Sequence, residues 1–498
     1  MTVEPKNCTH KSASWGERVL NRLPGGSSMT KAWIAFGILI LAGTATAGVS
    51  IPNLFPFFDL TGAVANYSST GSIDRTNTFF QSLGTNGRTC GTCHLPAEGM
   101  GLSATDAQLR YLVTGGKDPL FAAVDGAACP TAAPGKHLNY TPMLKSGLVR
   151  IALPIPDDAQ FTITAAQDPY GCALTTNDSG QTIVSFYRRP LPTTNLNFLS
   201  SVMFDGRETV APLNEESTYT ANLTTDLTQQ ALDATLTHAQ AEHPPTPTQL
   251  SLIVNFELAL NSAQLLDFKA GKLSTHGGNG GPKFLSTQEF YPGINDSLGG
   301  DPHGQKFDPN VFTIYSAWEN SRSKQQQSIY RGEQIFNTTP LTITAVSGLN
   351  DVLGQPTIIG TCTTCHDTPN VGDHSFALPL DIGTSHPLAY EQNSVIVASL
   401  QQLSVPTMPV FQIACTQGTL AGQTFYTSDP GKAMITGQCS DITRGKGLIL
   451  RGLAARAPYF HNGAAASLTQ VANFYNQRFQ MSLTQHEIQD LVNFLQTL

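Results

Sequence analysis

Two seven-residue segments contain the residue types most suited to chemistry. "RTCGTCH" covers residues 88–94 and "GTCTTCH" covers residues 360–366. Each places two cysteines three positions apart and follows the second with a histidine: Cys90, Cys93 and His94 in the first motif, and Cys362, Cys365 and His366 in the second. Zinc sites, redox-active dithiols and covalently attached haem all use a Cys-x-x-Cys core, so the rest of the chain must distinguish them.

The spacing and surroundings of the two motifs favour haem. A structural zinc site needs four protein ligands, usually from two neighbouring pairs, whereas most of the chain separates these pairs. A thioredoxin-like dithiol needs a βαβ context, whereas the flanking sequence is helix-like and rich in glycine. Covalent haem accounts for both cysteines and the histidine of each motif, because the thiols join its vinyl groups and the histidine binds the iron. The motifs therefore predict two covalently attached haem c groups, with His94 and His366 as proximal ligands.

The N-terminal sequence predicts export. The apolar run 32–49 follows Lys31 and ends in an Ala-x-Ala pattern at residues 45–47, which is the layout of a signal peptide. We assign residues 1–47 to this segment, with Met29 as an alternative start. An uncleaved membrane anchor is the alternative, but glycine and threonine interrupt the run and its end is cleavable. We expect a periplasmic protein.

Composition limits the partners, and cysteine number predicts crosslinks. Charged residues make up only 13% of the chain and the net charge is −8 without a strong run of either sign, so nucleic acid is not an expected partner. Beyond the motifs and the N-terminal segment, four cysteines remain in an exported chain. Sequential pairing predicts the disulfides Cys129–Cys172 and Cys415–Cys439, each within one proposed domain.

Hydrophobic periodicity and turn residues predict a mainly α protein built from two cytochrome c-like domains, each with one covalent haem. We place the N-terminal domain at 49–275, a glycine-rich linker at 276–309 and the C-terminal domain at 310–498. The first domain contains a long insertion, at about 110–200, whose proline and glycine predict irregular structure. Helical patterns cover residues 224–270, in the segments 227–242 and 245–268, and capping boxes at Ser467 with Gln470 and at Thr484 with Glu487 predict the last two helices.

Two further segments resemble a known family. "RGLAARAPYFHNGAAASLTQVANFY" (451–475) and "MFDGRETV" (203–210) are similar to motifs of the bacterial dihaem cytochrome c peroxidase and MauG superfamily. The resemblance touches both halves of the chain and leaves the insertion unmatched. It implies that the N-terminal haem reduces hydrogen peroxide and that the C-terminal haem receives electrons from a small exported cytochrome c or cupredoxin. The family often holds calcium between its domains, but no carboxylate cluster in the sequence identifies such a site, so calcium stays unassigned.

The resemblance places the distal ligand of the second haem in the helix after "YFHNG". Tyr475 occupies that position, and Met481 is the rival ligand. A phenolate ligand favours ferric iron, whereas a thioether raises the reduction potential. We expect His461 to hydrogen-bond a haem propionate. His374, shortly after the second motif, is another possible ligand, but its segment "GDHS" is interpreted more simply as a surface turn.

The first haem departs from the family at the distal side. The family's distal glutamate corresponds to Gln240, which cannot transfer a proton, whereas the neighbouring His238 and Glu242 can. His238 is expected either to act as acid–base group or to bind the iron itself. Met100 is too near the motif to reach across the ring easily. Phe204 stands where the family usually has tryptophan between the haems.

Two functions remain open from the sequence. One is a peroxidase-type enzyme with His238, Gln240 and Glu242 around the reacting oxygen atoms. The other is a non-enzymatic electron carrier in which both irons have two axial ligands. The difference between them is a single open coordination position on one iron.

Overall fold

A computed structural model describes residues 49–498, so the predicted signal segment and the alternative start at Met29 lie outside the described residues. From Pro52 to the C-terminus the chain forms one compact unit, and the predicted boundaries near 275 and 310 stay predictions. Among the described residues, no helix combines the length and the apolar character needed to cross a bilayer.

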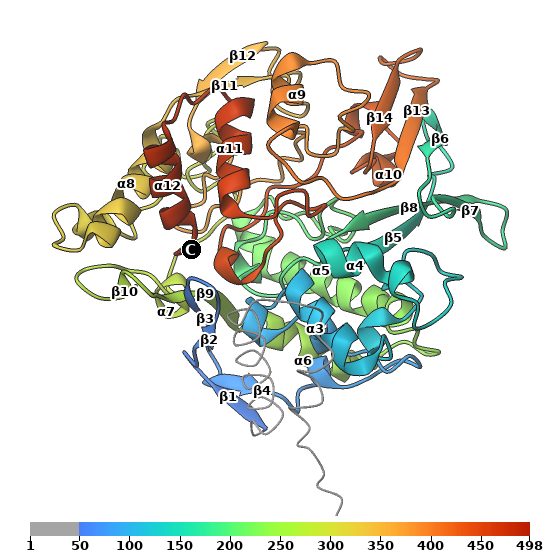
Figure 1. Cartoon of the computed structure of the whole chain (residues 1–498), viewed down its shortest axis with the longest axis horizontal. Coiled ribbons are helices and arrows are strands. Elements are labelled where there is room, and N and C mark those ends of the chain that lie inside the picture. The colour runs from blue at the N-terminus through green and yellow to red at the C-terminus, as the bar shows by residue number, and fades with distance from the viewer. Residues whose placement is uncertain (1–48) are drawn as a thin grey trace, which may run out of the picture. The chain divides into compact units, whose positions relative to one another are not determined.

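The secondary structure is mixed α/β, and the prediction of a mainly α protein is wrong. Small antiparallel sheets alternate with helices along the chain (Figure 1). Threonine, valine and aromatic residues, as in "TIVSFYR" at 182–188, favour the pleated strand conformation. The sequence-based prediction underestimated these runs because most strands are short and lack a long alternating pattern.

A four-stranded sheet and three helices frame the first motif. The sheet has the order β10-β9-β3-β2, with β2 (Phe57–Phe58), β3 (Gly62–Ser68), β9 (Leu260–Asp267) and β10 (Gly271–Lys272). The helices are α3 (Ala104–Thr114), α5 (Glu216–Thr237) and α6 (Pro247–Leu258).

The helix predicted over 245–268 ends early. A Thr246–Gln249 capping box starts α6, but the chain then leaves the helix and pairs along its length with β3 as strand β9. Leu252, expected on the buried face, is 45% exposed, whereas Ile253 is fully buried. The apolar spacing did not separate helix from strand here because the strand partner lies about 200 residues away in sequence.

The predicted insertion is not irregular. It contains α4 (Thr141–Ser146) and the sheet β5-β8-β7, formed by β5 (Val149–Pro154), β7 (Leu174–Thr176) and β8 (Thr182–Arg188). Strand β6 (Phe161–Gln167) joins a second sheet, β14-β13-β6, with β13 (Val410–Cys415) and β14 (Thr424–Thr427). In Figure 1, β6 lies beside β13, where Ile163 pairs with Ile413. The insertion therefore packs against the C-terminal half.

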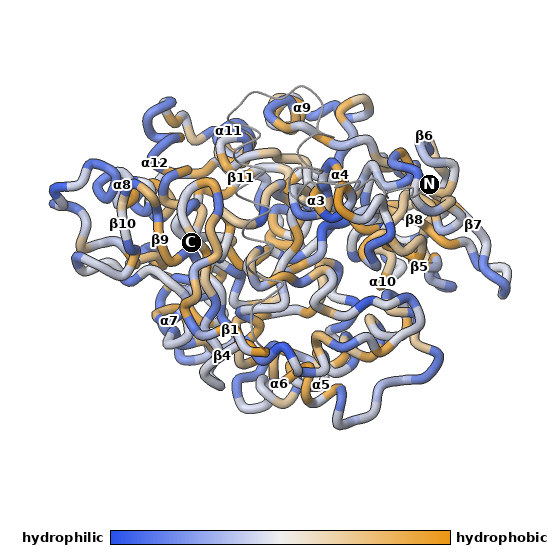
Figure 2. The backbone as a smooth tube through the Cα atoms, turned by 60° about the horizontal axis from the view of Figure 1, so that its bottom comes forward, coloured by the Kyte–Doolittle hydropathy of each residue, from blue (hydrophilic) through white to orange (hydrophobic). Residues whose placement is uncertain are grey.

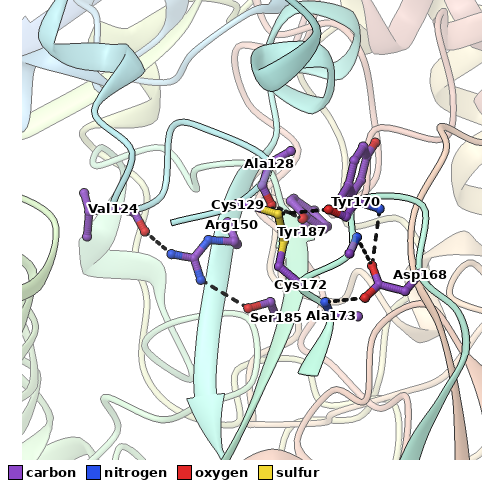
Figure 3. Close-up of a disulfide and its surroundings, with 11 residues drawn as sticks. Val124, Ala128, Cys129, Arg150, Asp168, Tyr170, Cys172, Ala173, Ser185 and Tyr187 are labelled. Atoms are coloured by element: carbon purple, nitrogen blue, oxygen red, sulfur yellow. Dashed lines mark hydrogen bonds between the residues drawn. A yellow bond between two sulfur atoms is a disulfide. The ribbon is translucent and has the colours of Figure 1, made fainter. Parts of the chain in front are cut away.

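Both predicted disulfides are present, Cys129–Cys172 in the insertion and Cys415–Cys439 beside β13. Figure 3 shows the first with its neighbours. The hydroxyl of Tyr187 on β8 donates to the carbonyl of Ala128, 2.5 Å away, and Asp168 accepts the backbone N–H of Ala173 at 2.9 Å. The crosslink holds the 122–129 loop against the β5-β8-β7 sheet.

The C-terminal half packs α8 (Lys324–Thr338) against α12 (Gln485–Leu495), with α11 (Leu468–Arg478) and α9 (Ser394–Leu400) nearby (Figure 1). The Thr484–Glu487 capping box is confirmed. Ser467 caps α11 through the N–H of Gln470, but the Gln470 side chain binds the N–H of Ala466, so the second box is incomplete.

Shorter elements connect these parts, and Figure 2 shows hydrophilic residues concentrated in protruding loops such as the one carrying β7. The remaining helices and strands are β1 (Ser50–Pro52), β4 (Ser72–Asp74), α7 (Pro282–Leu285), β11 (Leu341–Thr344), β12 (Thr357–Gly360) and α10 (Ala433–Thr436). The 3-10 helices away from the two motifs are η3 (Pro96–Glu98), η4 (Pro119–Phe121), η5 (His137–Tyr140), η6 (Leu196–Phe198), η7 (Ser316–Trp318), η9 (Cys439–Asp441) and η10 (Leu453–Ala455).

Candidate haem sites

The two Cys-x-x-Cys-His motifs fold in the same way. Each forms a single 3-10 turn, η2 (Cys90–Thr92) and η8 (Cys362–Thr364), preceded by a threonine that caps it. The histidine N–H then donates to the carbonyl of the first cysteine, at 3.1 Å in both motifs. This turn places both sulfur atoms and the imidazole on the wall of one cavity.

The two imidazoles are oriented by equivalent carbonyl groups. Nδ1 of His94 lies 3.2 Å from the carbonyl of Met100, and Nδ1 of His366 lies 2.9 Å from the carbonyl of Gly372. Met100 thus contributes through its backbone, which has a positive φ of 59°, as has Gly372 with 75°. With its Nδ1 proton donated, each ring presents the Nε2 lone pair to a metal. Burial lowers the pKa of both histidines, that of His94 to about 4.

An aromatic residue upstream of each motif packs beside its histidine, as the sequence suggested for the first. Phe79, in η1 (Thr78–Phe80), has its ring centroid 6.3 Å from that of His94. Phe336 on α8 occupies the equivalent place at 5.9 Å from His366. The apolar surroundings keep the four cysteines neutral: burial raises the pKa of Cys90, Cys362 and Cys365 to about 12 and that of Cys93 to about 11.

These thiols fit haem attachment better than zinc or dithiol chemistry. They are not paired in disulfides, and reactive dithiols need a lowered pKa. Within residues 49–498, neither motif belongs to a group of three His, Cys, Asp or Glu ligand atoms close enough to share a metal ion. A tetrahedral zinc site would require such a group.

Each motif opens into its own large cavity. The first, of about 220 Å³, contains the thiols of Cys90 and Cys93 and the ring of His94. The second, of about 270 Å³, contains Cys362, Cys365 and His366. Pockets of this kind, mostly apolar with a few convergent polar groups, are typical of cofactor sites.

A buried cation without a partner supports a carboxylate-bearing cofactor in the first cavity. Arg451 lines this cavity, is 2% exposed, and has no hydrogen-bond partner on any of its three guanidinium nitrogens. An unpaired buried charge is costly, and a haem propionate is the kind of anion that would satisfy it. The donor set therefore fits a haem group, and Arg451 would bind its propionate.

The distal side of the first cavity is built around His238. This residue follows the last turn of α5 and lines the cavity together with His94. Its Nδ1 hydrogen-bonds to Oδ2 of Asp125, and Oδ1 of the same carboxylate pairs with Arg88. Burial raises the pKa of Asp125, but His238 and Arg88 outweigh burial, so its pKa is lowered and the carboxylate is ionised.

Asp125 comes from the insertion and was not identified from the sequence. Its backbone carbonyl accepts the N–H of Arg150 on β5 at 2.8 Å, and the Arg150 side chain also donates to the carbonyl of Val124 (Figure 3). The disulfide-held loop thus places the carboxylate of Asp125 beside His238, which belongs to a different segment of the sequence. Arg88, adjacent to the motif, was the one local signal that a buried acid would be needed.

Gln240 and Glu242 do not share this site. Both side chains are exposed and neither lines the cavity. The chain leaves α5 at Thr237 and turns, with Gln240 at a positive φ of 54°, so the two residues follow a loop away from the cavity. The expectation that they surround the reacting atoms is corrected. Glu257 on α6 lines the cavity instead, with Oε2 unpaired and its pKa raised to about 8 by burial.

The second cavity has an aromatic and thioether wall. Tyr475 and Met481 both line it and pack in one apolar cluster with Cys362 and Cys365. Burial raises the pKa of Tyr475 strongly, with a smaller effect from the two thiols. The sequence-based choice between these two ligands stays a prediction.

His461 and Phe204 lie where the two cavities meet. Phe204 lines both cavities, as do residues 189–192. Its ring stacks on that of His461, with centroids 4.5 Å apart and planes 12° from parallel. His461 lines the second cavity, and its Nε2 lies 3.1 Å from Oγ of Ser385. Its predicted propionate contact stays a prediction.

His374 is not in a surface turn. It is 3% exposed and lines the second cavity. The carbonyl of Gly372 in "GDHS" accepts a hydrogen bond from Nδ1 of His366. The N–H of Ser375 donates to the buried carboxylate of Asp367. Because of these two bonds the turn faces inward.

Comparisons with known proteins add little to this geometry. No protein-family model and no curated protein matches the chain. A solved structure described as a MauG-like protein associated with microbial copper homeostasis is similar over 66% of this chain and 79% of its own, with 12% identity and a TM-score of 0.27. Similarity at this level supports no assignment of fold or function.

Proposed function

We propose that the protein is an exported, periplasmic dihaem c-type cytochrome that reduces hydrogen peroxide in the first cavity. Electrons would enter at the second cavity from a small exported donor, a cytochrome c or a cupredoxin. The proposal rests on the paired motif loops and on the different walls opposite them. When bound, the haem groups supply the one-electron redox chemistry that the side chains of this chain cannot supply.

The observation that carries the peroxidase proposal is the Asp125–His238 pair in the same cavity as His94. Reduction of H₂O₂ to two molecules of water consumes two electrons and two protons. A base must take the proton from one oxygen atom and return it to the other. With Nδ1 fixed by an ionised carboxylate, the Nε2 lone pair of His238 is available for that transfer.

Electron exchange between the sites would pass the wall that the cavities share. Phe204 lies in this wall, stacked on His461 and below the guanidinium of Arg188, 4.9 Å from the ring centroid. Phenylalanine is hard to oxidise, so it serves here as packed medium between the cavities. This disfavours remote oxidation of a protein substrate through residue 204.

The same geometry favours a second candidate function, that of a pure electron carrier. An Nε2 lone pair held by an Asp–His hydrogen bond is also the arrangement of a metal ligand. If His238 binds the first iron, and Tyr475 or Met481 binds the second, no coordination position stays open for peroxide. The two candidates therefore differ in what His238 does, and one experiment separates them.

The test mixes fully reduced, haem-loaded protein rapidly with one equivalent of hydrogen peroxide and follows both haem spectra. We expect both haems to be oxidised together, and His238→Gln to slow this step by about 10²-fold or more with an unchanged resting spectrum. Glu242→Gln, which changes an exposed acid on the loop that follows α5, is the matched control. Absence of any response in the wild type contradicts the enzyme, and a changed resting spectrum in His238→Gln identifies a ligand instead.

A further inference from the structure

Three buried side chains beside the second motif form a cluster, and one of them, His374, also lines the second cavity. Asp296, Asp367 and His374 are 3%, 0% and 3% exposed, and one ligand atom from each lies within 4.8 Å of the others. Asp367 directly follows His366, whereas Asp296 comes from a loop about 70 residues earlier. This distance in sequence explains why no carboxylate cluster was visible before the fold was known.

Each member has one atom without a hydrogen-bond partner: Oδ1 of Asp296, Oδ2 of Asp367 and Nε2 of His374. The last two atoms lie 3.3 Å apart but are not aligned for a hydrogen bond. Buried polar atoms are nearly always paired. Three unpaired atoms on side chains this close together indicate a group that satisfies all of them.

The other polar atom of each side chain is fixed by the backbone. Oδ2 of Asp296 accepts the N–H of Gly300 at 2.6 Å, and Oδ1 of Asp367 accepts the N–H of Ser375 at 2.7 Å. Nδ1 of His374 lies 3.1 Å from the carbonyl and 3.2 Å from the nitrogen of Phe376. With the proton on Nδ1, the carbonyl accepts it and Nε2 presents its lone pair to the cluster, as in metal-binding histidines.

The charges of the cluster are not balanced by protein groups. Among the ion pairs of residues 49–498, no lysine or arginine pairs with Asp296 or Asp367; the carboxylate of Asp367 lies near His374 of the same cluster. A divalent cation would neutralise both carboxylates.

We propose that Asp296, Asp367 and His374 bind one divalent first-row transition-metal ion, of which Zn²⁺ and Mn²⁺ are the test cases. One imidazole nitrogen and two carboxylate oxygens suit such ions. Calcium fits less well, because it takes six to eight oxygen ligands. The site is separate from the haem iron and does not depend on the proposed peroxidase activity.

The position of the site gives it a structural role at the second haem. Asn295 donates to the carbonyl of Asp367 at 3.1 Å, and Ser297 donates to the carbonyl of Thr364 at 2.7 Å. The loop carrying Asp296 therefore already contacts the turn that presents His366. A metal ion would fix this loop to the residue after the iron ligand and hold the imidazole in place.

The experiment starts from haem-loaded, full-length protein. The chelator-treated wild type is titrated with Zn²⁺, Mn²⁺ or Ca²⁺ by calorimetry, and bound metal other than haem iron is counted by mass spectrometry. We expect one Zn²⁺ or Mn²⁺ per chain and at least tenfold weaker Ca²⁺ binding. X-ray absorption of the zinc form should show a nitrogen and oxygen shell near about 2.0–2.1 Å.

Asp296→Asn and His374→Gln should each weaken binding by tenfold or more. Asp301→Asn is the matched control, because Asp301 lies on the same loop with its carboxylate satisfied by Tyr291, Asn295 and His303. No stoichiometric metal in the wild type, calcium binding alone, or full affinity in His374→Gln overturns the proposal. The wild-type titration decides the question even if a variant does not fold.

Discussion

The two motif loops and the walls opposite them can be compared directly. Both loops use the same 3-10 turn, the same histidine–carbonyl hydrogen bond and an aromatic residue beside the imidazole. The first cavity is then lined by His238 with Asp125 and by the buried, unpaired Glu257, whereas the second is lined by Tyr475 and Met481 and by an acid, Asp381, whose carboxylate is paired. In each cavity the motif loop is formed by residues adjacent in sequence, whereas the rest of the wall comes from segments far apart in the sequence. This difference is the basis for the proposal of proton chemistry in the first cavity and electron entry at the second.

The largest expected effect tests the feature that the two sites share, the pair of cysteines in each motif. Replacing Cys90 and Cys93 with serine should remove the first covalent haem, and replacing Cys362 and Cys365 should remove the second. Each double variant should therefore retain half of the wild-type covalent haem, measured by the pyridine haemochrome assay on denatured protein. A double variant with full haem content would contradict attachment at that motif.

The next effect tests a difference between the two cavities, the Asp125–His238 pair of the first. Asp125→Asn removes the carboxylate that sets the His238 tautomer and leaves Arg88 without its charge partner. We expect peroxide-driven oxidation of the reduced protein to slow by about 10²-fold or more. The measurement is stopped-flow absorbance.

The matched change for Asp125→Asn is Asp381→Asn, because Asp381 is a buried acid of the second cavity that pairs with His386. It should leave the bimolecular peroxide step unchanged. Equal losses in the two variants would indicate a general structural effect and would remove Asp125 from the chemistry.

A smaller effect concerns the ligand of the second iron. If the phenol of Tyr475 binds this iron as the sequence resemblance implies, Tyr475→Phe should change the ferric spectrum of one haem and raise its reduction potential, because phenolate stabilises ferric iron. Met481→Leu should leave both unchanged. Spectroelectrochemistry measures both variants, and the reverse pattern would assign the ligand to Met481.

The sequence predicted those features that depend on short-range pattern. Both disulfides, α5 and the last helices follow from spacing within a few residues or from pairing of nearby cysteines. The β6–β13 pairing and the end of α6 at Leu258 depend on strands far away in the chain, which no local pattern encodes. The mainly α prediction was wrong for this reason.

The same distinction applies to the candidate sites. His238 was identifiable because histidine is a conspicuous acid–base residue near the expected helix end. Asp125 and Glu257 were not, because an acidic residue in a loop or helix is ordinarily exposed, and only the fold buries these two. Gln240 was chosen because it aligns with the family's distal glutamate, and Glu242 as its neighbour, but the structure ends this helix at Thr237.

The smallest expected effect is a difference in pH dependence between two buried acids. Glu257 in the first cavity has an unpaired oxygen, and burial raises its pKa from 4.5 to about 8. Asp381 in the second cavity is paired with His386 at 2.7 Å and with Thr443 at 2.6 Å, which outweigh burial and lower its pKa.

Between about pH 4.5 and 8, Glu257 binds a proton in the folded protein but not in the unfolded one. The free energy of unfolding therefore falls as pH rises through this range. Glu257→Gln should remove this fall, so the variant gains stability relative to the wild type as pH increases from 5 to 8. Urea unfolding of the haem-loaded protein at several pH values measures the difference.

Asp381 behaves in the opposite way, because its pKa is lowered in the folded state. Its contribution is complete above its unfolded pKa of 3.8 and is lost only as pH falls below it. Asp381→Asn should thus lower the free energy of unfolding by about 3 kcal/mol, the cost of a broken buried pair. This loss should shrink above about pH 6.5, because Asp381 and Glu391 outweigh burial and raise the pKa of His386 to about 10 in the folded protein, whereas the unfolded chain binds that proton only below about pH 6.5. A flat difference for Glu257→Gln from pH 5 to 8 would show that a partner such as a haem propionate or a bound cation offsets its burial. The first cavity would then resemble the second in having its acids paired.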